Sequence, residues 1–328
     1  MPSNGPVAGS FAGRPVVVTG GAGFIGSHLV EMLVGLGADV LTVVDSLSTG
    51  SLSNLREVDS EITIERLDLV HDDLRPTLES TQFDTLFHLA GNANVNRSVE
   101  DPRMDLENNL LCTFRVLEAI RDASPDTQIV FTSSATVYGE GPGVPIREDH
   151  PKIPESPYGV SKLACEHYLR LFARLYGLKT ATVRLFSVYG PRLRKQVVYD
   201  FMCKLRENPD ELFIYGDGTQ VRDMNHVANV VEALLLISRR AAMEGEVYNV
   251  ASGEPVTILE LAHGLCAAMG LRPEFAFSGE VRPGETQKWV PDPKKLFDLG
   301  YRNRVSLAEG LADTASWFLE EEPRSIRD

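Results

Sequence analysis

The amino-acid sequence predicts an α/β fold, in which a doubly wound parallel sheet is followed by a smaller C-terminal α/β region. The first half of the 328-residue chain alternates short apolar, β-branched runs with amphipathic helical patterns. Strands that alternate with helices form βαβ units with right-handed crossovers, and such units build a mostly parallel sheet. A glycine-rich turn joins the first run to the first helical pattern, and the alternation weakens beyond residue 187.

The expected elements follow from these patterns in chain order. Strands are expected at residues 15–19, 40–44, 62–66, 85–90, 128–132, 180–185 and 247–250. Helices are expected at residues 104–123, 159–176 and 226–240. We expect a disordered leader at residues 1–13, a dinucleotide-binding domain at 14–186, and a mainly substrate-binding region at 187–328 from which residues 226–250 return to the first domain.

The first turn has the spacing of a dinucleotide-binding site. Gly20, Gly23 and Gly26 follow the first expected strand and precede a helical pattern. Glycines at this spacing allow a tight turn, a close approach of the backbone to a pyrophosphate, and close packing of the helix on the sheet. The free N–H groups of the first helical turn then face the phosphates.

Asp45 strengthens this prediction because it ends the second expected strand. A carboxylate at that position accepts hydrogen bonds from the adenosine ribose hydroxyls. It repels a 2′-phosphate, so the pattern favours NAD over NADP. The alternative is that Asp45 only caps the turn formed by residues 46–50.

Tyr158 and Lys162 are a candidate general base and its tuning cation. They lie four residues apart where a long helix begins, which places both side chains on one face. An ammonium near a phenol favours the phenolate and lowers a pKa that is ordinarily about 10. This spacing alone is common on ordinary helices. Ser134, which follows the expected strand at 128–132, adds a hydroxyl that can orient a substrate oxygen, the alternative being that it only satisfies turn backbone groups.

Charge and cysteine usage exclude several classes of function. The formal net charge of −14 argues against a nucleic acid or an anionic membrane as partner. The four cysteines are scattered without metal-binding spacing and suit a reducing cytoplasm. The first residues lack the basic and apolar segments of a signal peptide, and no apolar run approaches the length of a membrane span. We therefore predict a cytoplasmic protein without a metal site.

The expected helix at 159–176 carries apolar residues over about half of its circumference, which is wider than packing on one sheet face requires. One apolar stripe contains Val160, Ala164, Tyr168, Leu171 and Leu175, and an adjacent stripe contains Cys165, Leu169, Phe172 and Tyr176. We expect a homodimer interface formed by this helix and the helix at 104–123. The alternative is deeper burial within one subunit.

Taken together, these residues resemble the extended short-chain dehydrogenase/reductase family, and within it the nucleotide-sugar epimerases related to UDP-glucose 4-epimerase. The resemblance runs along nearly the whole chain and implies a Rossmann-like domain. It rests on the segments Thr19–Leu29, Asp45–Gly50, Asp68–Leu69, His88–Gly91, Ser133–Gly139, Tyr158–Lys162, Val188–Arg192, Tyr215–Asp223 and Arg282–Glu285.

The resemblance implies a role for each matching residue. Asp68 and Leu69 lie at the adenine, and the NAD site as a whole contains Gly20, Gly23, Phe24, Ile25, Gly26, Asp45, Ser48, Thr49, Gly50, Asp68, Leu69, Leu89, Ala90, Gly91, Tyr158 and Lys162. The catalytic residues are Tyr158, Lys162, Ser134 and Thr136. The substrate site contains Ser134, Thr136, Ser187, Arg192, Arg222, Arg282 and Trp289. The arginines suit a diphosphate, although surface ion pairing is the alternative for Arg222 and Arg282.

Thr136 indicates which reaction the resemblance implies. In the similar 4,6-dehydratases and uronic-acid decarboxylases an acidic residue occupies this position and serves the elimination or decarboxylation. Threonine cannot supply that acid, so the expected activity is a nucleotide-sugar 4-epimerase of the UDP-hexose or UDP-uronate type. Tyr158 would take the proton of the sugar 4-hydroxyl while C4 gives hydride to NAD, and hydride would return to the opposite face of a 4-keto intermediate.

Several positions depart from the family pattern. Ser187 stands where the family has asparagine, Ala228–Asn229 where it often has two aspartates, and Cys112 where it has glycine. Trp289 falls where room for a 2-N-acetyl group is decided, and a bulky side chain there disfavours N-acetylated sugars. The alternatives are another NAD-dependent nucleotide-sugar enzyme (an epimerase at another carbon, a 4,6-dehydratase, a decarboxylase or a ketoreductase) and a non-catalytic NAD-binding module.

Overall fold

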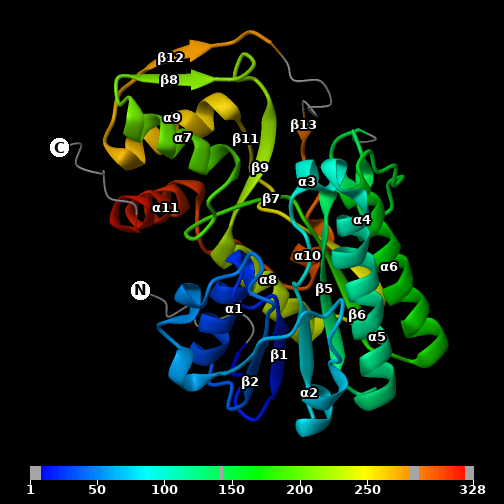
Figure 1. The fold of residues 1–328 in the computed structure, drawn as a ribbon. Helices are drawn as coiled ribbons and strands as arrows, with labels where there is room; N and C mark the ends of the chain where they lie inside the picture. Colours follow the sequence, from blue (N-terminus) through cyan, green and yellow to red (C-terminus); the bar gives the residue numbers. More distant parts are fainter. Residues whose placement is uncertain (1–8, 141–142, 281–287, 322–328) are drawn as a thin grey trace.

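A seven-stranded parallel sheet forms the larger part of the molecule (Figure 1). The computed structural model describes residues 9–140, 143–280 and 288–321. The strand order is β10-β6-β5-β4-β1-β2-β3. The strands are β1 (Val16–Thr19), β2 (Leu41–Val44), β3 (Thr63–Glu65), β4 (Thr85–His88), β5 (Gln128–Ser134), β6 (Thr180–Leu185) and β10 (Glu244–Val250). The doubly wound α/β fold is therefore confirmed.

Both faces of this sheet are buried, as the unbroken apolar runs predict. Side chains alternate between two cores, so that Val16 and Val18 pack on one face and Val17 on the other. The first face is covered by α1 (Phe24–Gly35) and α8 (Val227–Arg240). The second is covered by α2 (Arg75–Ser80), α5 (Cys112–Ala123) and α6 (Pro157–Tyr176). Short helical turns η1 (Leu52–Leu55), η2 (Asp59–Glu61) and η4 (Ala135–Tyr138) complete this part.

Part of the expected leader is packed against the sheet domain. Phe11 is fully buried in the first core, and the Gly13 N–H donates to the Asp39 carboxylate at 2.6 Å. Ordered packing therefore begins before residue 14, the boundary expected for the first domain. The division into domains stays a prediction, although β10 does join the sheet beside β6.

The helix expected at 104–123 is interrupted. Its first residues belong to α4 (Pro102–Asp105), which follows α3 (Val95–Glu100). A π-helical segment, η3 (Leu106–Leu111), then leads into α5. Single π-helical turns inside helices are uncommon and are frequent at functional sites.

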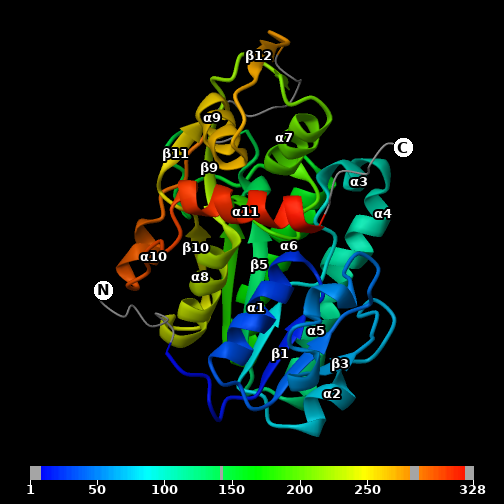
Figure 2. The same cartoon turned by 90° about the vertical axis from the view of Figure 1, so that its left-hand side faces the viewer.

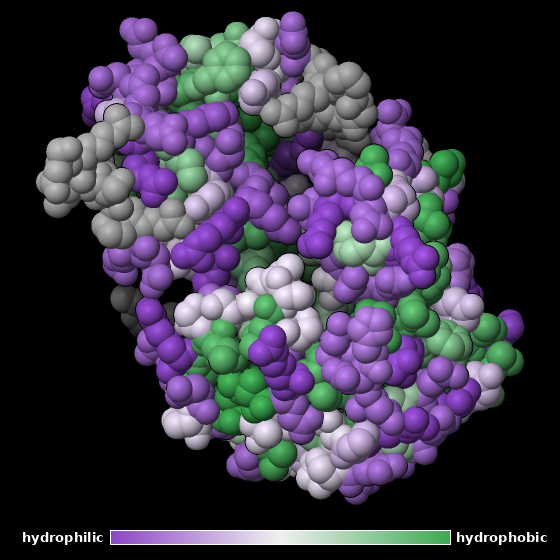
Figure 3. Space-filling model, viewed as in Figure 1, coloured by the Kyte–Doolittle hydropathy of each residue, from purple (hydrophilic) through white to green (hydrophobic). Residues whose placement is uncertain are grey.

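The second region lies at the carboxyl ends of the sheet strands (Figure 1). Its sheets contain β7 (Ser187–Tyr189), β8 (Glu211–Ile214), β9 (Val221–His226), β11 (Pro255–Thr257), β12 (Glu274–Phe277) and β13 (Lys288–Trp289). Its helices are α7 (Gln196–Glu207), α9 (Ile258–Met269) and α11 (Leu307–Glu321), whereas α10 (Lys294–Asp298) packs beside β10 and contributes Leu296 to the first core. Figure 2 shows α11 crossing between the two parts of the molecule. Figure 3 shows that the surface is hollowed between these parts.

The wide apolar surface of α6 divides between two environments. Cys165, Leu169 and Phe172 are buried in the second core. Val160, Leu175 and Tyr176 remain about half exposed, at 54%, 57% and 50%. Burial within the subunit thus accounts for most of the second stripe but not for Tyr176, and it leaves Val160 and Leu175 of the first stripe at the surface. Among the described residues, no helix is both long and apolar enough to cross a membrane.

Candidate active site

The turn between β1 and α1 leaves no room for side chains. Gly20 has a φ of +72°, and a Cβ there would lie 2.7 Å from the Ala90 nitrogen. A Cβ on Gly26 would lie 2.2 Å from the Gly20 carbonyl oxygen. Gly23 is the N-cap of α1, and no side chain caps this helix. The N–H groups of its first turn, which includes Phe24 and Ile25, are therefore available to an anion.

Asp45 follows β2 and hydrogen-bonds to the glycine turn. Its carboxylate is buried and accepts hydrogen bonds from the Ala22 N–H at 2.9 Å and the Leu47 N–H at 2.8 Å. Through the bond from Leu47, Asp45 caps the turn at residues 46–50, as the alternative interpretation required. A carboxylate has about four acceptor positions, so these two bonds leave capacity for a hydroxyl donor. The loop with Ser48, Thr49 and Gly50 follows directly, and a Cβ on Gly50 would lie 2.9 Å from the Ala22 carbonyl carbon.

The remaining predicted cofactor residues follow the next strands of the sheet. Leu89, Ala90 and Gly91 follow β4, where the Leu89 N–H donates to the Thr19 carbonyl at 3.0 Å. Asp68 and Leu69 lie beyond β3, where Asp68 accepts from the Val70 N–H and Leu69 is buried. Strands of a parallel sheet end at a common edge, so these segments line one side of a shared site.

Ser134 and Thr136 stand at the carboxyl end of β5. Oγ of Ser134 accepts hydrogen bonds from the Thr136 N–H at 3.2 Å and the Thr136 hydroxyl at 3.0 Å. Ser134 therefore caps η4, as the turn interpretation required. Its side chain also interacts with Tyr158 and lowers the pKa of the phenol. The structure thus brings Ser134 and Tyr158 together.

Tyr158 and Lys162 lie on the buried face of α6. Burial raises the pKa of Tyr158 to about 12, and this outweighs the lowering by the Ser134 hydrogen bond. The ammonium of Lys162 donates to the Thr132 carbonyl at 3.2 Å and lies 5.9 Å from the centre of the Tyr158 ring. The lowering of the phenol pKa that was expected from Lys162 is therefore wrong for this structure, because burial has the largest effect on the phenol and Lys162 is not among the groups that shift its pKa.

The local sequence explains why α6 presents these side chains. The Ser156 hydroxyl caps the helix by accepting from the Gly159 N–H, and Pro157 follows as its first residue. The Tyr158 N–H donates to the Ser98 hydroxyl of α3 at 3.2 Å. A Cβ on Gly159 would lie 2.8 Å from the Thr136 carbonyl oxygen, so this glycine allows the helix to approach η4 closely.

Two buried polar groups beside these residues were not predicted from the sequence. The first is an ion pair between Arg184 of β6 and Glu166 of α6, at 2.6 Å. Glu166 also accepts from the Ser133 hydroxyl at 2.6 Å. The second is the carboxyl group of Asp105, at the end of α4. The sequence feature that could have indicated a buried Glu166 is its position four residues after Lys162, on the same face of the helix. Asp105 has no such feature, because its burial results from packing between distant segments.

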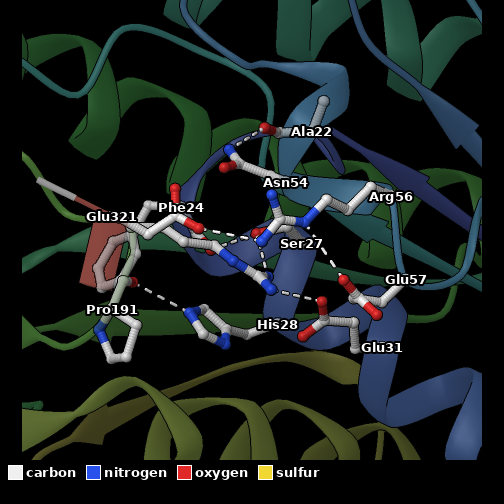
Figure 4. Close-up of polar contacts among 11 residues, drawn as sticks. Ala22, Phe24, Ser27, His28, Glu31, Asn54, Arg56, Glu57, Pro191 and Glu321 are labelled. Atoms are coloured by element: carbon white, nitrogen blue, oxygen red, sulfur yellow. Dashed lines mark hydrogen bonds and ion pairs between the residues drawn. The ribbon is translucent and has the colours of Figure 1, made fainter. Parts of the chain in front are cut away.

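The predicted substrate arginines have different surroundings. Arg192 is turned toward α1, where it donates to the Ser27 hydroxyl at 3.0 Å and pairs with Glu31. Figure 4 shows this cluster, in which the His28 ring also hydrogen-bonds to the Pro191 carbonyl at 3.1 Å. Arg192 thus joins the loop after β7 to α1. Arg282 lies outside the described residues.

The other predicted substrate residues gather around β9. Arg222 of β9 is aligned with Trp289 of β13. Trp289 packs edge-on against Phe186 at 5.8 Å between ring centres. Ser187 begins β7, which pairs with the following residues of β9, Met224 to His226. These residues therefore share one small sheet, above the edge that carries Ser134 and Tyr158.

Comparisons with known proteins agree with this fold. The family described as GDP-mannose 4,6 dehydratase matches residues 17–314. A putative UDP-glucose 4-epimerase of Methanocaldococcus jannaschii is 34% identical over 307 residues, covering 92% of this chain and 98% of that protein. The UDP-glucose 4-epimerase of Thermotoga maritima, solved with UDP-glucose, is 34% identical with a TM-score of 0.84, and the match covers 94% and 99% of the two chains.

A dehydratase is nearly as similar. The dTDP-glucose 4,6-dehydratase of Streptomyces venezuelae, solved with NAD bound, is 31% identical with a TM-score of 0.84. That match covers 94% of this chain and 97% of the other. The similarity therefore includes enzymes of more than one reaction.

Proposed function

The chain belongs to the extended short-chain dehydrogenase/reductase family, in its nucleotide-sugar epimerase and dehydratase group, and from this premise we propose that it is a nucleotide-sugar 4-epimerase. Its cofactor is NAD. The substrate is a nucleoside diphosphate sugar of the UDP-hexose or UDP-uronate type. The proposal depends on how Ser134, Thr136 and Tyr158 are arranged, since these side chains reach the reacting hydroxyl.

The residues around the glycine turn fit NAD. A Cβ at Gly20 would collide with the backbone of Ala90, and a Cβ at Gly26 with the backbone of Gly20, so glycine at both positions permits the tight turn that opens the N-terminus of α1 to a diphosphate. The uncapped N-terminus of α1 supplies N–H donors to the phosphates, and Asp45 supplies acceptors to the adenosine ribose. When bound, NAD would provide an acceptor for hydride from the sugar, a donor for its return, and a positively charged ring.

Tyr158 acts as the general base of the reaction. Its phenolate accepts the proton of the sugar 4-hydroxyl as C4 is oxidised, and gives the proton back when C4 is reduced. The pKa of about 12 must fall for this role, and a positive charge close to the phenol has that effect. Ser134 donates a hydrogen bond that stabilises the phenolate or orients the sugar oxygen, and Lys162 holds the adjoining ribose.

Thr136 is the observation that favours epimerisation. Its hydroxyl is already donated to Ser134 at 3.0 Å, and threonine has no acidic proton for expelling water or carrying out a decarboxylation. Removal and return of hydride needs no further acid. The alternative is another NAD-dependent enzyme of the group, such as a dehydratase.

The second region supplies the substrate contacts. Arg222 and Arg282 hold the diphosphate or its ribose, because a guanidinium donates two parallel hydrogen bonds to phosphate oxygens. Ser187 contributes a short donor to the same group. Trp289, packed against Phe186, narrows the sugar pocket and disfavours a 2-N-acetyl substituent.

We further propose that the protein is a cytoplasmic homodimer. The exposed residues Val160, Leu175 and Tyr176 of α6, together with Leu106 and Leu111 of η3, form an apolar surface that a second copy would cover. All four cysteines are unpaired, as suits a reducing compartment.

Light scattering on the purified protein tests the dimer, which is expected to dissociate in the variant Val160→Glu with Leu175→Glu.

The activity is tested by incubating the purified protein with UDP-glucose, UDP-glucuronate and their GDP, CDP and dTDP counterparts. The expected product is inverted at C4 and forms without added NAD, since no net oxidation occurs. Loss of water or carbon dioxide would replace this proposal by a dehydratase or a decarboxylase. Absence of turnover with all of them would favour a non-catalytic module.

Tyr158→Phe is the matched control. It keeps the ring and its packing and removes the phenolic oxygen. The rate is expected to fall by about 10²–10⁴-fold, the range typical of a lost general base. NAD should remain bound in this variant, and a variant that has also lost NAD would not isolate the role of the base.

A further inference from the structure

Asp105 is a fully buried carboxyl group with incomplete hydrogen bonding. It ends α4, where the π-helical segment η3 begins. Its Oδ1 accepts from the Asn92 side-chain amide at 2.7 Å and from the Asn109 side-chain amide at 2.8 Å. Its Oδ2 is buried without a hydrogen-bond partner among the described residues. A buried oxygen without a donor costs free energy, so the group requires an explanation.

Asn109 is oriented by this contact. Because its amide nitrogen donates to Asp105, its carbonyl Oδ1 is turned the other way, toward Gly91. A Cβ on Gly91 would lie 2.5 Å from Oδ1 of Asn109 and 3.6 Å from Nζ of Lys162. The carbonyl and the ammonium thus flank the same glycine. This Oδ1 is also buried without a partner among the described residues.

The charge of Asp105 acts on the proposed catalytic pair. It raises the pKa of Tyr158 and the pKa of Lys162, while burial lowers the pKa of Lys162. Several other groups surround the pair, and they are His88 of β4, Cys112 of α5, Cys165 and Glu166 of α6, and Ser134 of β5. Asp105 lies on α4, which contributes no residue to the predicted NAD or substrate site.

We propose that Asp105 is a positioning residue of the active site, which turns the Asn109 carbonyl toward Gly91, the glycine that Lys162 also approaches, and supplies a buried negative charge near the Tyr158–Lys162 pair. This inference rests on the proposed function, in which that pair is catalytic. A side chain that only linked Asn92 and Asn109 by hydrogen bonds would not need a charge, because the amide oxygen of an asparagine offers the same acceptor. What the carboxyl group adds to such an acceptor is its charge, which acts on the neighbouring phenol and ammonium.

Asp105→Asn tests the charge with little change of shape. The amide oxygen can still accept from Asn92 and Asn109, whereas the negative charge is gone. Titration of Tyr158 is measured in the NAD-loaded protein as the ultraviolet difference between each protein and its Tyr158→Phe counterpart. The midpoint is expected to fall by about one pH unit, the effect typical of a neighbouring charge.

The pH dependence of turnover gives a second measurement. Loss of the charge lowers the pKa of the phenol and of the ammonium together. Both limbs of the kcat/KM profile are therefore expected to move to lower pH in Asp105→Asn. A variant with only a damaged fold would lose rate without moving the limbs.

Asn92→Ala is the control, because it removes one amide donor and keeps the charge. Its phenol titration is expected to match that of the unmodified protein. If Asp105→Asn fails to fold, Asp105→Ser offers the same loss of charge in a smaller side chain. An unchanged phenol midpoint in a folded variant overturns the inference.

The two proposals fail separately. A shifted phenol midpoint without turnover of any nucleotide sugar would leave this inference standing and remove the epimerase. Turnover of a nucleotide sugar together with an unchanged phenol midpoint in Asp105→Asn would leave the epimerase standing and remove this inference.

Discussion

The hydroxyl of Thr136 donates a hydrogen bond to Oγ of Ser134 at 3.0 Å. Since Ser134 is an acceptor in this contact, its own proton remains for Tyr158 or a substrate oxygen. In Thr136→Val that orientation is lost, and kcat/KM for the proposed reaction is expected to fall about fivefold, the equivalent of one ordinary hydrogen bond. Steady-state rates with the substrate that turns over measure the effect.

Thr136→Ser keeps the hydroxyl and is the matched control for this prediction. It should stay close to the unmodified protein in kcat/KM. A loss in the serine variant as large as that in the valine variant would contradict this prediction, because serine keeps the hydroxyl and lacks only the methyl group.

Two glycines of α1 should respond differently to the same change. A Cβ on Gly26 would lie 2.2 Å from the Gly20 carbonyl, whereas a Cβ on Gly35 meets nothing within 4 Å. Gly26→Ala must therefore distort the turn that we propose holds the diphosphate, and the purified protein is expected to lose its NAD. Gly35→Ala should keep NAD and gain stability of about 0.5–1 kcal/mol, because alanine favours the helix.

Bound NAD is measured by absorbance after denaturation, and stability by urea unfolding. Retention of NAD at the level of Gly35→Ala in a folded Gly26→Ala protein would contradict the proposed diphosphate site.

The parts of the site that could be predicted from the sequence depend on short, continuous segments. The glycine turn is a strand, a turn and a helix in succession, so its spacing alone predicted the tight geometry at Gly20 and Gly26. Tyr158 and Lys162 share a helical face for the same reason. Ser134 was recognisable because it follows a strand whose end lies at the ligand-binding edge.

Features that depend on contacts between distant segments were not predicted. Arg192 suits a diphosphate in the sequence, but the fold brings α1 close enough for Glu31 to pair with it. The interruption of the helix at 104–123 has no proline or glycine to mark it. Asp105 is distinctive only because packing removes it from water without giving its second oxygen a donor. Such properties arise when the elements meet.

Removing one partner of the ion pair between Glu166 and Arg184 should strongly lower the free energy of unfolding. Both side chains are almost fully buried, at 5% and 3% exposure. Glu166→Gln leaves the guanidinium without a counter-charge, which is expected to cost about 3–5 kcal/mol in the free energy of unfolding. Urea denaturation at pH 7 measures the loss.

A double-mutant cycle separates the pair from its surroundings. Glu166→Gln combined with Arg184→Met removes both charges, and the double variant should be more stable than the sum of the single losses predicts. Additive losses would mean that the two charges do not act together.

His88 should make the protein less stable in acid. Burial lowers the pKa of His88 to about 3, and the ring hydrogen-bonds to the hydroxyls of Thr19 at 2.7 Å and Thr113 at 3.1 Å. An unfolded histidine has a pKa of about 6.5, so below that pH the unfolded chain binds a proton that the folded chain excludes. The stability that the neutral ring contributes is complete above pH 6.5 and is lost as the pH falls toward 3. The slope is about 1.4 kcal/mol per pH unit for one proton.

In His88→Gln this contribution is absent, so its free energy of unfolding, measured in urea between pH 7 and pH 4, should decline less steeply than that of the unmodified protein. His28, whose pKa burial also lowers, to about 4, is present in both proteins and its effect cancels. Parallel curves would show that His88 does not exclude the proton, and that the polar contacts of its ring tolerate a charge.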